Sequence, residues 1–343
     1  MIYIKMCLLC SFFVMIPFLM FCQNKDSIIQ KKERNDSIVF VITNKVFDSL
    51  QNRFSIFENH TDTKDPLKCY TFTSQDSTLN DHSIHKMENL NEILNCDKDL
   101  LIFIHGDGKT TNNAVMRGLK IQNLYDLKII VFSWTSKMEK VNGLKNFKNS
   151  KKNIELGILK FKEMLLQIQE LKKMRDFQTK KIHISLCMHS LGNYYMERMV
   201  KDSLLSGLHD ELFDNIIFNA AAVNQKEHSK WMNQLHIQKR IYITSNKKDF
   251  NLNGVRVFTK SRKQLGERLK LPLSENSNYI NFTKAIGFMF PTHLTHTYFL
   301  GGIRGENINQ FYFNLFHGKE IQLNDSTLFI RRKDGLGHNI LVN

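Results

Sequence analysis

Cysteine is scarce in the part of this sequence that can fold, and its scarcity excludes two classes of protein. Six cysteines occur, of which three lie within the first 22 residues. The others, Cys69, Cys96 and Cys187, are too few and too scattered for a disulfide framework or a zinc site. No CxxC pair occurs outside the first 22 residues, and the histidines lack the spacing of metal ligands. We therefore expect no metal site.

Proline and low-complexity sequence are also scarce, which excludes an obvious linker. Only four prolines occur among 343 residues, with no Gly/Ser tract and no internal repeat. A hydrophobic share of 42% and a charged share of 24% suit a globular protein with a sizeable core. We expect one catalytic domain at 98–318, preceded by a strand-containing extension at 23–97 and followed by a C-terminal tail or hairpin at 319–343.

The first 22 residues form a leader. Lys5 is the only charge among them, and a long apolar run follows it. This pattern predicts a secretory signal peptide or a membrane anchor. Cleavage before Gln23 and lipidation at Cys22 are both compatible with the sequence. We expect an exported protein of the periplasm or cell envelope, either free, anchored or a lipoprotein.

Positive charge dominates the chain, with a formal net charge of +15. Between Lys137 and Lys181 thirteen basic residues stand against five acidic ones. Such a region could attract an anionic membrane surface, nucleic acid or an acidic substrate, although a solvated helix face gives the same pattern. Nothing in the sequence resembles a nucleic-acid-binding module, so we expect no nucleic-acid partner.

Short apolar segments alternate with helical patterns along most of the chain. Strands are predicted at 37–44, 100–104, 128–134, 182–187, 215–221 and 240–245, and helices at 112–124, 190–206, 226–236 and 307–318. One long helix is predicted after residue 134, where Ile154, Ile158, Phe161, Leu165 and Ile168 recur at helical spacing. This alternation indicates an α/β fold with a mostly parallel sheet that is buried on both faces.

Polar residues follow three of these strands, where the functional groups of a parallel sheet are expected. They lie in the segments 105–111, 188–193 and 246–250. In the second segment, Ser190 stands between a strand and a helix, where a tight turn would expose its hydroxyl beside the helix N-terminus. Small residues suit such a turn two positions before and after the serine. Gly192 meets this requirement, whereas Met188 does not.

Several blocks resemble the α/β-hydrolase superfamily, and more narrowly a poorly characterised bacterial branch of its serine hydrolases. The blocks are FVITNK (40–45), FIHGDGKT (103–110), VFSWTS (131–136), MHSLGN (188–193), ITSNKKDF (243–250), KQLGERL (263–269) and HTYF (296–299). The corresponding stretches of that branch read roughly TNR, HGYN, FSWPS, AHSMGN, S-x-x-D, RLG and HSYF. The resemblance implies an α/β-hydrolase fold over about residues 40–318, with helices on both faces of the sheet.

The resemblance also implies a triad in the chain order nucleophile, acid, base. Matched block by block, Ser190 is the nucleophile, Asp249 the acid and His296 the base. Serine is a weak nucleophile unless a base removes its proton, and the base needs an acid to orient it. Asp249 could instead be an ordinary turn residue, with Asp210 or Asp214 as the acid.

Three further histidines compete with His296 for the role of base, namely His293, His317 and His338. His296 is preferred because the block HTYF precedes a final helix that should pack back on the sheet.

Backbone N–H groups would stabilise the oxyanion of the reaction. The resemblance assigns them to Leu191 and to either Gly106 or Asp107. Asp107 stands where the branch has an aromatic residue, so we expect a changed pocket mouth. His105 and His189 flank the site, and we interpret both as structural residues that fix the oxyanion loop and the turn.

Phe132 and Trp134, at another strand end, are interpreted as core or pocket wall, and the segment 219–224 as shaping the site.

These observations predict a serine hydrolase that cleaves an ester-type bond, such as a carboxylic ester, a lipid ester or a thioester, without any cofactor. An acyltransferase with the same triad is one alternative. A non-catalytic, membrane-associated binding module of the cell envelope with a hydrolase fold is another. The acyl substrate's identity and chain length, and the oligomeric state, are not readable from the sequence.

Overall fold

The computed structural model describes residues 37–45, 61–74, 84–88, 90–95, 97–138, 140–141, 143–174, 179–259, 263–287, 291–301 and 305–342. The predicted leader, with Cys22, lies outside these ranges. None of the helices within them combines the length and hydropathy of a transmembrane span.

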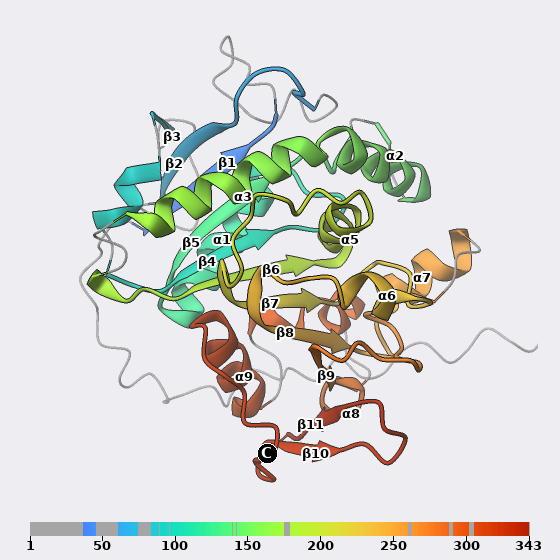
Figure 1. The fold of residues 1–343 in the computed structure, drawn as a ribbon. Coiled ribbons are helices and arrows are strands. Elements are labelled where there is room, and N and C mark those ends of the chain that lie inside the picture. The colour runs from blue at the N-terminus through green and yellow to red at the C-terminus, as the bar shows by residue number, and fades with distance from the viewer. Residues whose placement is uncertain are drawn as a thin grey trace, which may run out of the picture. The chain divides into compact units, whose positions relative to one another are not determined.

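Within the described residues, eleven strands form one sheet in the order β10-β11-β9-β8-β7-β6-β4-β5-β1-β2-β3 (Figure 1). The strands are β1 (Ser37–Thr43), β2 (Lys68–Ser74), β3 (Ile84–Met87), β4 (Leu100–Ile104), β5 (Lys128–Ser133), β6 (Ile184–His189), β7 (Phe213–Asn219), β8 (Gln238–Ser245), β9 (Ser277–Asn281), β10 (Phe329–Arg331) and β11 (His338–Ile340). The pairs from β1 through β5, β4, β6, β7 and β8 to β9 are all parallel. The predicted α/β fold with a mostly parallel sheet is confirmed.

Helices cover both faces of this sheet. They are α1 (Thr111–Tyr125), α2 (Gly143–Leu156), α3 (Ile158–Lys173), α5 (Asn193–Lys201), α6 (His228–Met232), α7 (Phe250–Thr259), α8 (Thr283–Ile286) and α9 (Glu306–Phe316). Short 3₁₀ turns are η2 (Leu90–Asn95), η3 (Ser190–Gly192), η4 (Thr292–Thr295) and η5 (Tyr298–Leu300). Apolar residues of α2, α3, α5 and α6 form one core cluster with the sheet, and those of α1, α8 and α9 form another. The central strands are buried on both faces, which explains their continuous apolar sequences.

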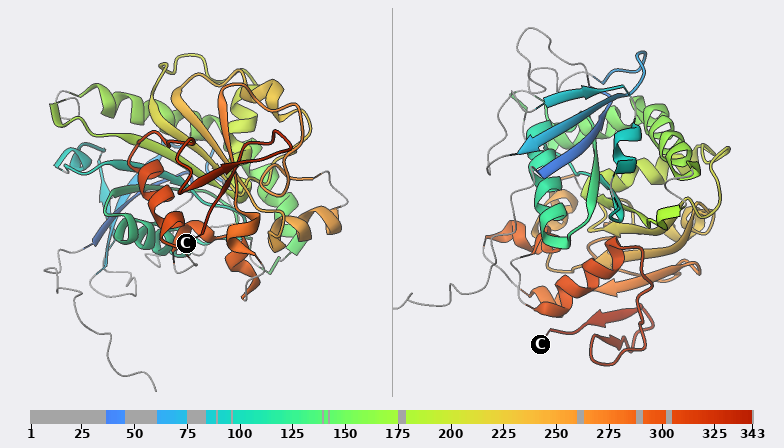
Figure 2. Two further views of the ribbon diagram at one scale, coloured as in Figure 1. Left: turned by 90° about the horizontal axis from the view of Figure 1, so that it is seen from below. Right: turned by 90° about the vertical axis from the view of Figure 1, so that its left-hand side faces the viewer.

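Both ends of the sheet are built from antiparallel strands (Figure 2). At one end, β2 pairs antiparallel with β1 and β3, and β1 joins the parallel strands through β5. The predicted extension at 23–97 therefore supplies one side of the central sheet. At the other end, β10 and β11 form a hairpin, and β11 pairs parallel with β9.

The single long helix predicted after residue 134 is wrong, because the chain forms two helices, α2 and α3, that meet at Gly157. A Cβ atom at Gly157 would lie 2.6 Å from Nδ2 of Asn44 and 3.1 Å from the carbonyl oxygen of Asn153. The close approach of β1's end requires glycine there, and glycine weakens a helix. The apolar stripe nevertheless faces the core, since both Ile154 and Phe161 are fully buried.

Candidate active site

Ser190 stands on a sharp turn between β6 and α5. Its backbone has a φ of 53°, in the left-handed region that is strained for a residue with a side chain. Two glycines allow this turn to pack closely against the end of β4. A Cβ atom at Gly192 would lie 2.7 Å from the carbonyl oxygen of His105, and one at Gly106 would lie 2.7 Å from the Cβ of Ser190. The loop after β4 therefore lies directly against Ser190.

Met188 does not prevent this turn, although it occupies the position where a small residue was expected. Its side chain is fully buried in the cluster that also contains Phe132 and Leu191. The carbonyl oxygen of Ser190 accepts hydrogen bonds from Ala222 N–H at 3.0 Å and from the Asn193 side chain at 2.8 Å. These bonds hold the strained turn in place.

Asp249 and His296 form a buried pair. Asp249 follows β8, is fully buried, and accepts a hydrogen bond from Nδ1 of His296 at 2.6 Å. Its other carboxylate oxygen accepts the N–H of Leu252 at 3.0 Å. Because the carboxylate can only accept, Nδ1 of His296 carries the proton and Nε2 is left as an acceptor.

Hydrogen bonds join the two loops that carry this pair. The Asn246 side chain donates to the carbonyl oxygen of Thr295 at 2.9 Å, and Phe250 N–H donates to the Thr295 hydroxyl at 3.0 Å. The separation of Asp249 and His296 is therefore fixed by their neighbours as well as by their own bond.

His296 lies beside the turn that carries Ser190. The ring centroids of His296 and His189, the residue before Ser190, are 4.5 Å apart. Ser190 is partly exposed, and its hydroxyl has no hydrogen-bond partner in the described part of the chain. The structure thus brings together the three residues that the sequence analysis proposed as a triad, with the hydroxyl of Ser190 accessible.

Unused backbone N–H groups lie on both sides of Ser190. In the loop after β4, Gly108 N–H and Lys109 N–H donate to Ser136. By contrast, no acceptor among the described residues takes the N–H of Gly106, Asp107 or Leu191. A carbonyl oxygen bound at Ser190 would be within reach of such donors, as an oxyanion hole requires.

The side chain of Asp107 is engaged by α2. Its carboxylate accepts hydrogen bonds from Asn146 at 2.8 Å and from Ser150 at 2.5 Å. Burial raises the pKa of Asp107 above its ordinary value. The carboxylate therefore anchors the loop to α2, in place of the changed pocket mouth that we expected.

His105 is neutral and fully hydrogen-bonded. Its Nε2 accepts the N–H of Trp134 at 3.2 Å, so its Nδ1 donates to the carbonyl oxygen of Gly106 at 2.9 Å. The indole of Trp134 stacks on the ring and donates to the His105 carbonyl oxygen at 2.9 Å. Burial, followed by the charge of Lys45, holds the pKa of His105 well below its ordinary value.

His189 is held by a buried network centred on Asn219, its neighbour across β6 and β7. The Asn219 amide lies 3.2 Å from Nδ1 of His189, and its oxygen accepts from the hydroxyls of Thr244 at 2.9 Å and Tyr312 at 2.5 Å. Burial, followed by the charge of His296, holds the pKa of His189 well below its ordinary value. His189 therefore presents a neutral ring to His296.

Comparison with known families agrees with this geometry. The family model described as "Alpha/beta hydrolase of unknown function (DUF900)" matches residues 82–298, which is more than half of the chain. The chain belongs to this family of α/β hydrolases. A search of curated proteins found no match.

The alternative acids of this α/β hydrolase lie elsewhere. Asp214, near the start of β7, binds Lys239 at 2.9 Å and Ile184 N–H at 3.1 Å. Asp210 is exposed and lies 3.7 Å from His236.

The alternative bases are also placed apart from Asp249. His317 pairs with Asp99 before the start of β4, His338 lies on β11, and His293 is exposed. Among the described histidines, His296 is the one that contacts Asp249.

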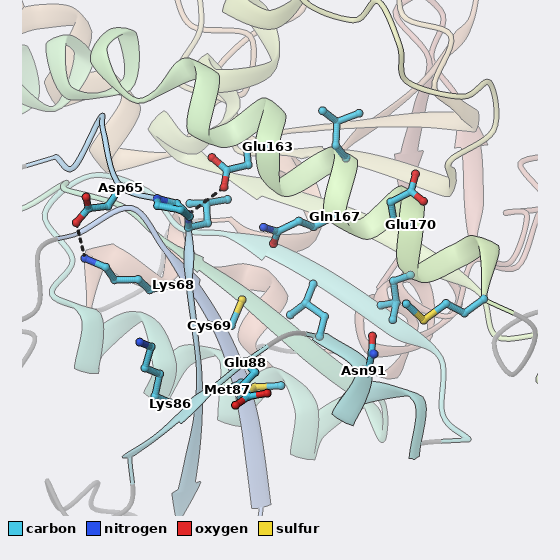
Figure 3. A pocket seen from close by; sticks show the side chains of 16 residues that line it. Asp65, Lys68, Cys69, Lys86, Met87, Glu88, Asn91, Glu163, Gln167 and Glu170 are labelled. Atoms are coloured by element: carbon cyan, nitrogen blue, oxygen red, sulfur yellow. Dashed lines mark hydrogen bonds and ion pairs between the residues drawn. The ribbon is translucent and has the colours of Figure 1, made fainter.

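A cavity of about 1000 Å³ lies between α3 and the strands β2 and β3 (Figure 3). Its lining combines apolar residues with charged ones such as Lys86, Glu163 and Glu170. Burial raises the pKa of Cys69 in its wall to about 11, so this thiol is a poor nucleophile at neutral pH. None of the residues assigned to the triad lines this cavity.

Two cations near the turn were not selected from the sequence. Lys109 follows Gly106 and Asp107 in the loop after β4, and Arg117 lies on α1. Both act electrostatically on His105 and on His189. Their positions gave no signal in the sequence, since lysine is abundant throughout the chain and Arg117 fits an ordinary helical pattern.

Proposed function

We propose that this α/β hydrolase is a serine hydrolase that cleaves an ester-type bond through Ser190, His296 and Asp249. The buried Asp249–His296 hydrogen bond of 2.6 Å beside the strained turn at Ser190 is the observation that supports it best. A buried carboxylate that fixes the tautomer of a histidine near an accessible serine is the arrangement required for nucleophilic catalysis.

The first step would be attack of Ser190 Oγ on the acyl carbonyl carbon. Nε2 of His296 takes the hydroxyl proton as the new C–O bond forms, and Asp249 stabilises the resulting imidazolium through Nδ1–H. The negative charge that develops on the carbonyl oxygen is stabilised by the N–H of Leu191 and that of Gly106 or Asp107.

The second half would release the products. His296 returns its proton to the leaving alcohol or thiol, and the acyl group remains on Ser190. Water then attacks the acyl-enzyme while Nε2 of His296 accepts its proton, and collapse of the second tetrahedral intermediate releases the acid and regenerates the hydroxyl. An acyltransferase would use another acceptor in place of water at this point.

Ester hydrolysis by the full-length protein tests this proposal, with esters of graded acyl length as substrates. Ser190→Ala should lower kcat by ~10⁴-fold or more, because residual catalysis would come only from binding and the oxyanion donors. Ser203→Ala is the matched control, since Ser203 also has a positive φ, of 56°, but is exposed and lies at the far end of α5. Wild-type activity in Ser190→Ala would refute the proposal.

The same assay separates the alternatives. Transfer of the acyl group to an added alcohol in preference to water would identify an acyltransferase. A folded wild-type protein that hydrolyses no ester, but binds anionic vesicles through the Lys137–Lys181 region in a salt-sensitive way, would indicate the binding module.

A further inference from the structure

Lys109 and Arg117 approach the candidate active site from two adjoining elements. Lys109 lies in the loop that carries the Gly106 and Asp107 amides, and α1 begins directly after this loop. Arg117 lies within the first two turns of α1. Side chains of a helix lean towards its N-terminus, and this direction carries Arg117 towards the loop and the carboxyl end of the sheet.

Contacts further along α1 identify what this face of the helix covers. Leu124 lies seven residues after Arg117, on the same helical face, and packs against Gly301. The Tyr125 hydroxyl donates to the carbonyl oxygen of Phe299 at 2.7 Å. Arg117 therefore lies about two turns closer to the active-site edge, on the face of α1 that packs along the segment following His296.

The charges of the two side chains converge on the site. Lys109 and Arg117 each lower the pKa of His105 and of His189, the residues that flank the Gly106 loop and Ser190. Arg117 also lowers the pKa of Lys109. Two like charges are thus held near each other beside the proposed nucleophile.

Neither cation has an anionic partner. No ion pair or side-chain hydrogen bond of Lys109 or Arg117 is formed with any described residue. The nearest acid that acts on Lys109 is Asp107, whose carboxylate is engaged by α2. Other cations differ, since Lys45 is buried but donates to Thr111 at 3.0 Å and Arg256 pairs with Glu267 at 2.9 Å.

An unpaired, largely buried cation is costly. Burial lowers the pKa of Arg117 to about 10, so the guanidinium remains charged at neutral pH. Arginine's planar donors match carboxylate and phosphate oxygens. A functional site is where such an unfavourable arrangement is expected, since the ligand supplies the missing charge.

We propose that Lys109 and Arg117 bind an anionic group, a carboxylate or a phosphate, on the substrate whose ester bond is attacked by Ser190. This inference rests on the proposed function. The substrate class would be an ester that carries a negative charge near the scissile bond, either a soluble acid or an acidic lipid headgroup.

Matched substrates test this selectivity in the full-length protein. The soluble pair is 4-nitrophenyl hexanoate and the mono-4-nitrophenyl ester of adipate, which adds a terminal carboxylate to the same acyl length. The lipid pair is phosphatidylcholine and phosphatidylglycerol in mixed micelles. Wild type should prefer the anionic member of at least one pair by tenfold or more in kcat/KM, and the pair that responds identifies the source of the anion.

Arg117→Met should lower kcat/KM for the preferred anionic substrate by ~10- to 100-fold, the usual effect of removing a charged hydrogen bond. The neutral partner should change by less than about twofold, because the triad is untouched. Lys120→Gln is the matched control, since Lys120 is an exposed cation on the same helix, and neither substrate should respond to it. Arg117→Lys should retain part of the preference.

A binding measurement separates this inference from the proposed function. In Ser190→Ala, which cannot turn over, inorganic phosphate should raise Tm, and Arg117→Met in the same background should remove most of that rise. Equal phosphate-dependent shifts with and without Arg117, or equal losses on charged and neutral esters, would overturn the anion site even if Ser190 proves to be the nucleophile. If Ser190→Ala retains hydrolysis, the proposed function fails whatever the phosphate result.

Discussion

This protein contains two histidine–aspartate pairs with almost the same hydrogen-bond length, at opposite ends of the central sheet. Asp99 and His317 are 2.7 Å apart near the start of β4, and Asp249 and His296 are 2.6 Å apart after the end of β8. The length of the bond therefore does not identify the functional pair.

The second nitrogen of each histidine distinguishes the pairs. Nε2 of His317 lies 2.8 Å from the carbonyl oxygen of Tyr125, so both ring nitrogens donate, and the Asp99 hydrogen bond raises the pKa of His317. Nε2 of His296 has no partner among the described residues. A fully bonded imidazolium stabilises the fold, whereas a neutral ring with a free nitrogen next to an accessible serine can act as a base.

The largest expected difference between the pairs comes from the same substitution in each. Asp249→Asn should lower kcat for ester hydrolysis by ~10⁴-fold, because the amide favours the wrong tautomer of His296. Asp99→Asn should leave kcat within about twofold and affect stability only. Kinetics of the two variants, checked for folding by circular dichroism, would contradict the comparison if both lost activity equally.

A smaller effect is expected at the unused amides, which only the Asp249–His296 end provides. Gly106→Ala places a methyl group 3.3 Å from Ser190 Oγ and 2.7 Å from its Cβ, so the loop must shift away. We expect kcat to fall by ~10²-fold, the usual effect of losing one oxyanion donor. Gly108→Ala, at a φ of 70° with nothing within 4 Å, is the control.

That control should cost about 1 kcal/mol of unfolding free energy through backbone strain, with nearly normal kcat. Equal kinetic losses in Gly106→Ala and Gly108→Ala would mean that loop strain, and not the position of the amides, governs activity.

The smallest effect concerns His317 and depends on pH. A raised pKa in the folded state means that the His317–Asp99 bond adds stability below the unfolded pKa of about 6.5, and that this stability is lost as the pH rises through the folded pKa. His317→Gln should therefore destabilise the protein by about 1 kcal/mol more at pH 6 than at pH 9. Urea unfolding at the two pH values measures this, and a loss that is independent of pH would contradict the charged state of His317.

The sequence predicted the architecture well because the central strands are buried on both faces and alternate with helices. Leu100–Ile104 is fully buried and has the predicted bounds. The break between α2 and α3 was missed because it depends on the approach of Asn44 to Gly157, a contact between segments far apart in the chain.

At the site, strand ends directed attention to the correct loops, but partners could not be assigned from residue types alone. His296 and His317 are indistinguishable as letters, and only the fold shows which aspartate each one meets. Asn219 was interpreted as shaping the site, whereas the parallel register of β6 and β7 makes it the partner of His189. Arg117 was missed because its role follows from the absence of a partner, which no sequence pattern records.

The most direct test of the account is whether Ser190 is an activated nucleophile. The full-length protein would be treated with a fluorophosphonate probe, and the modified residue mapped by mass spectrometry in wild type, Ser190→Ala, Asp249→Asn and Ser203→Ala. The account predicts a single adduct on Ser190 that is absent in Ser190→Ala, strongly slowed in Asp249→Asn and unchanged in Ser203→Ala. A folded wild type that forms no adduct at Ser190, or labels equally fast when Asp249 is replaced, would contradict it.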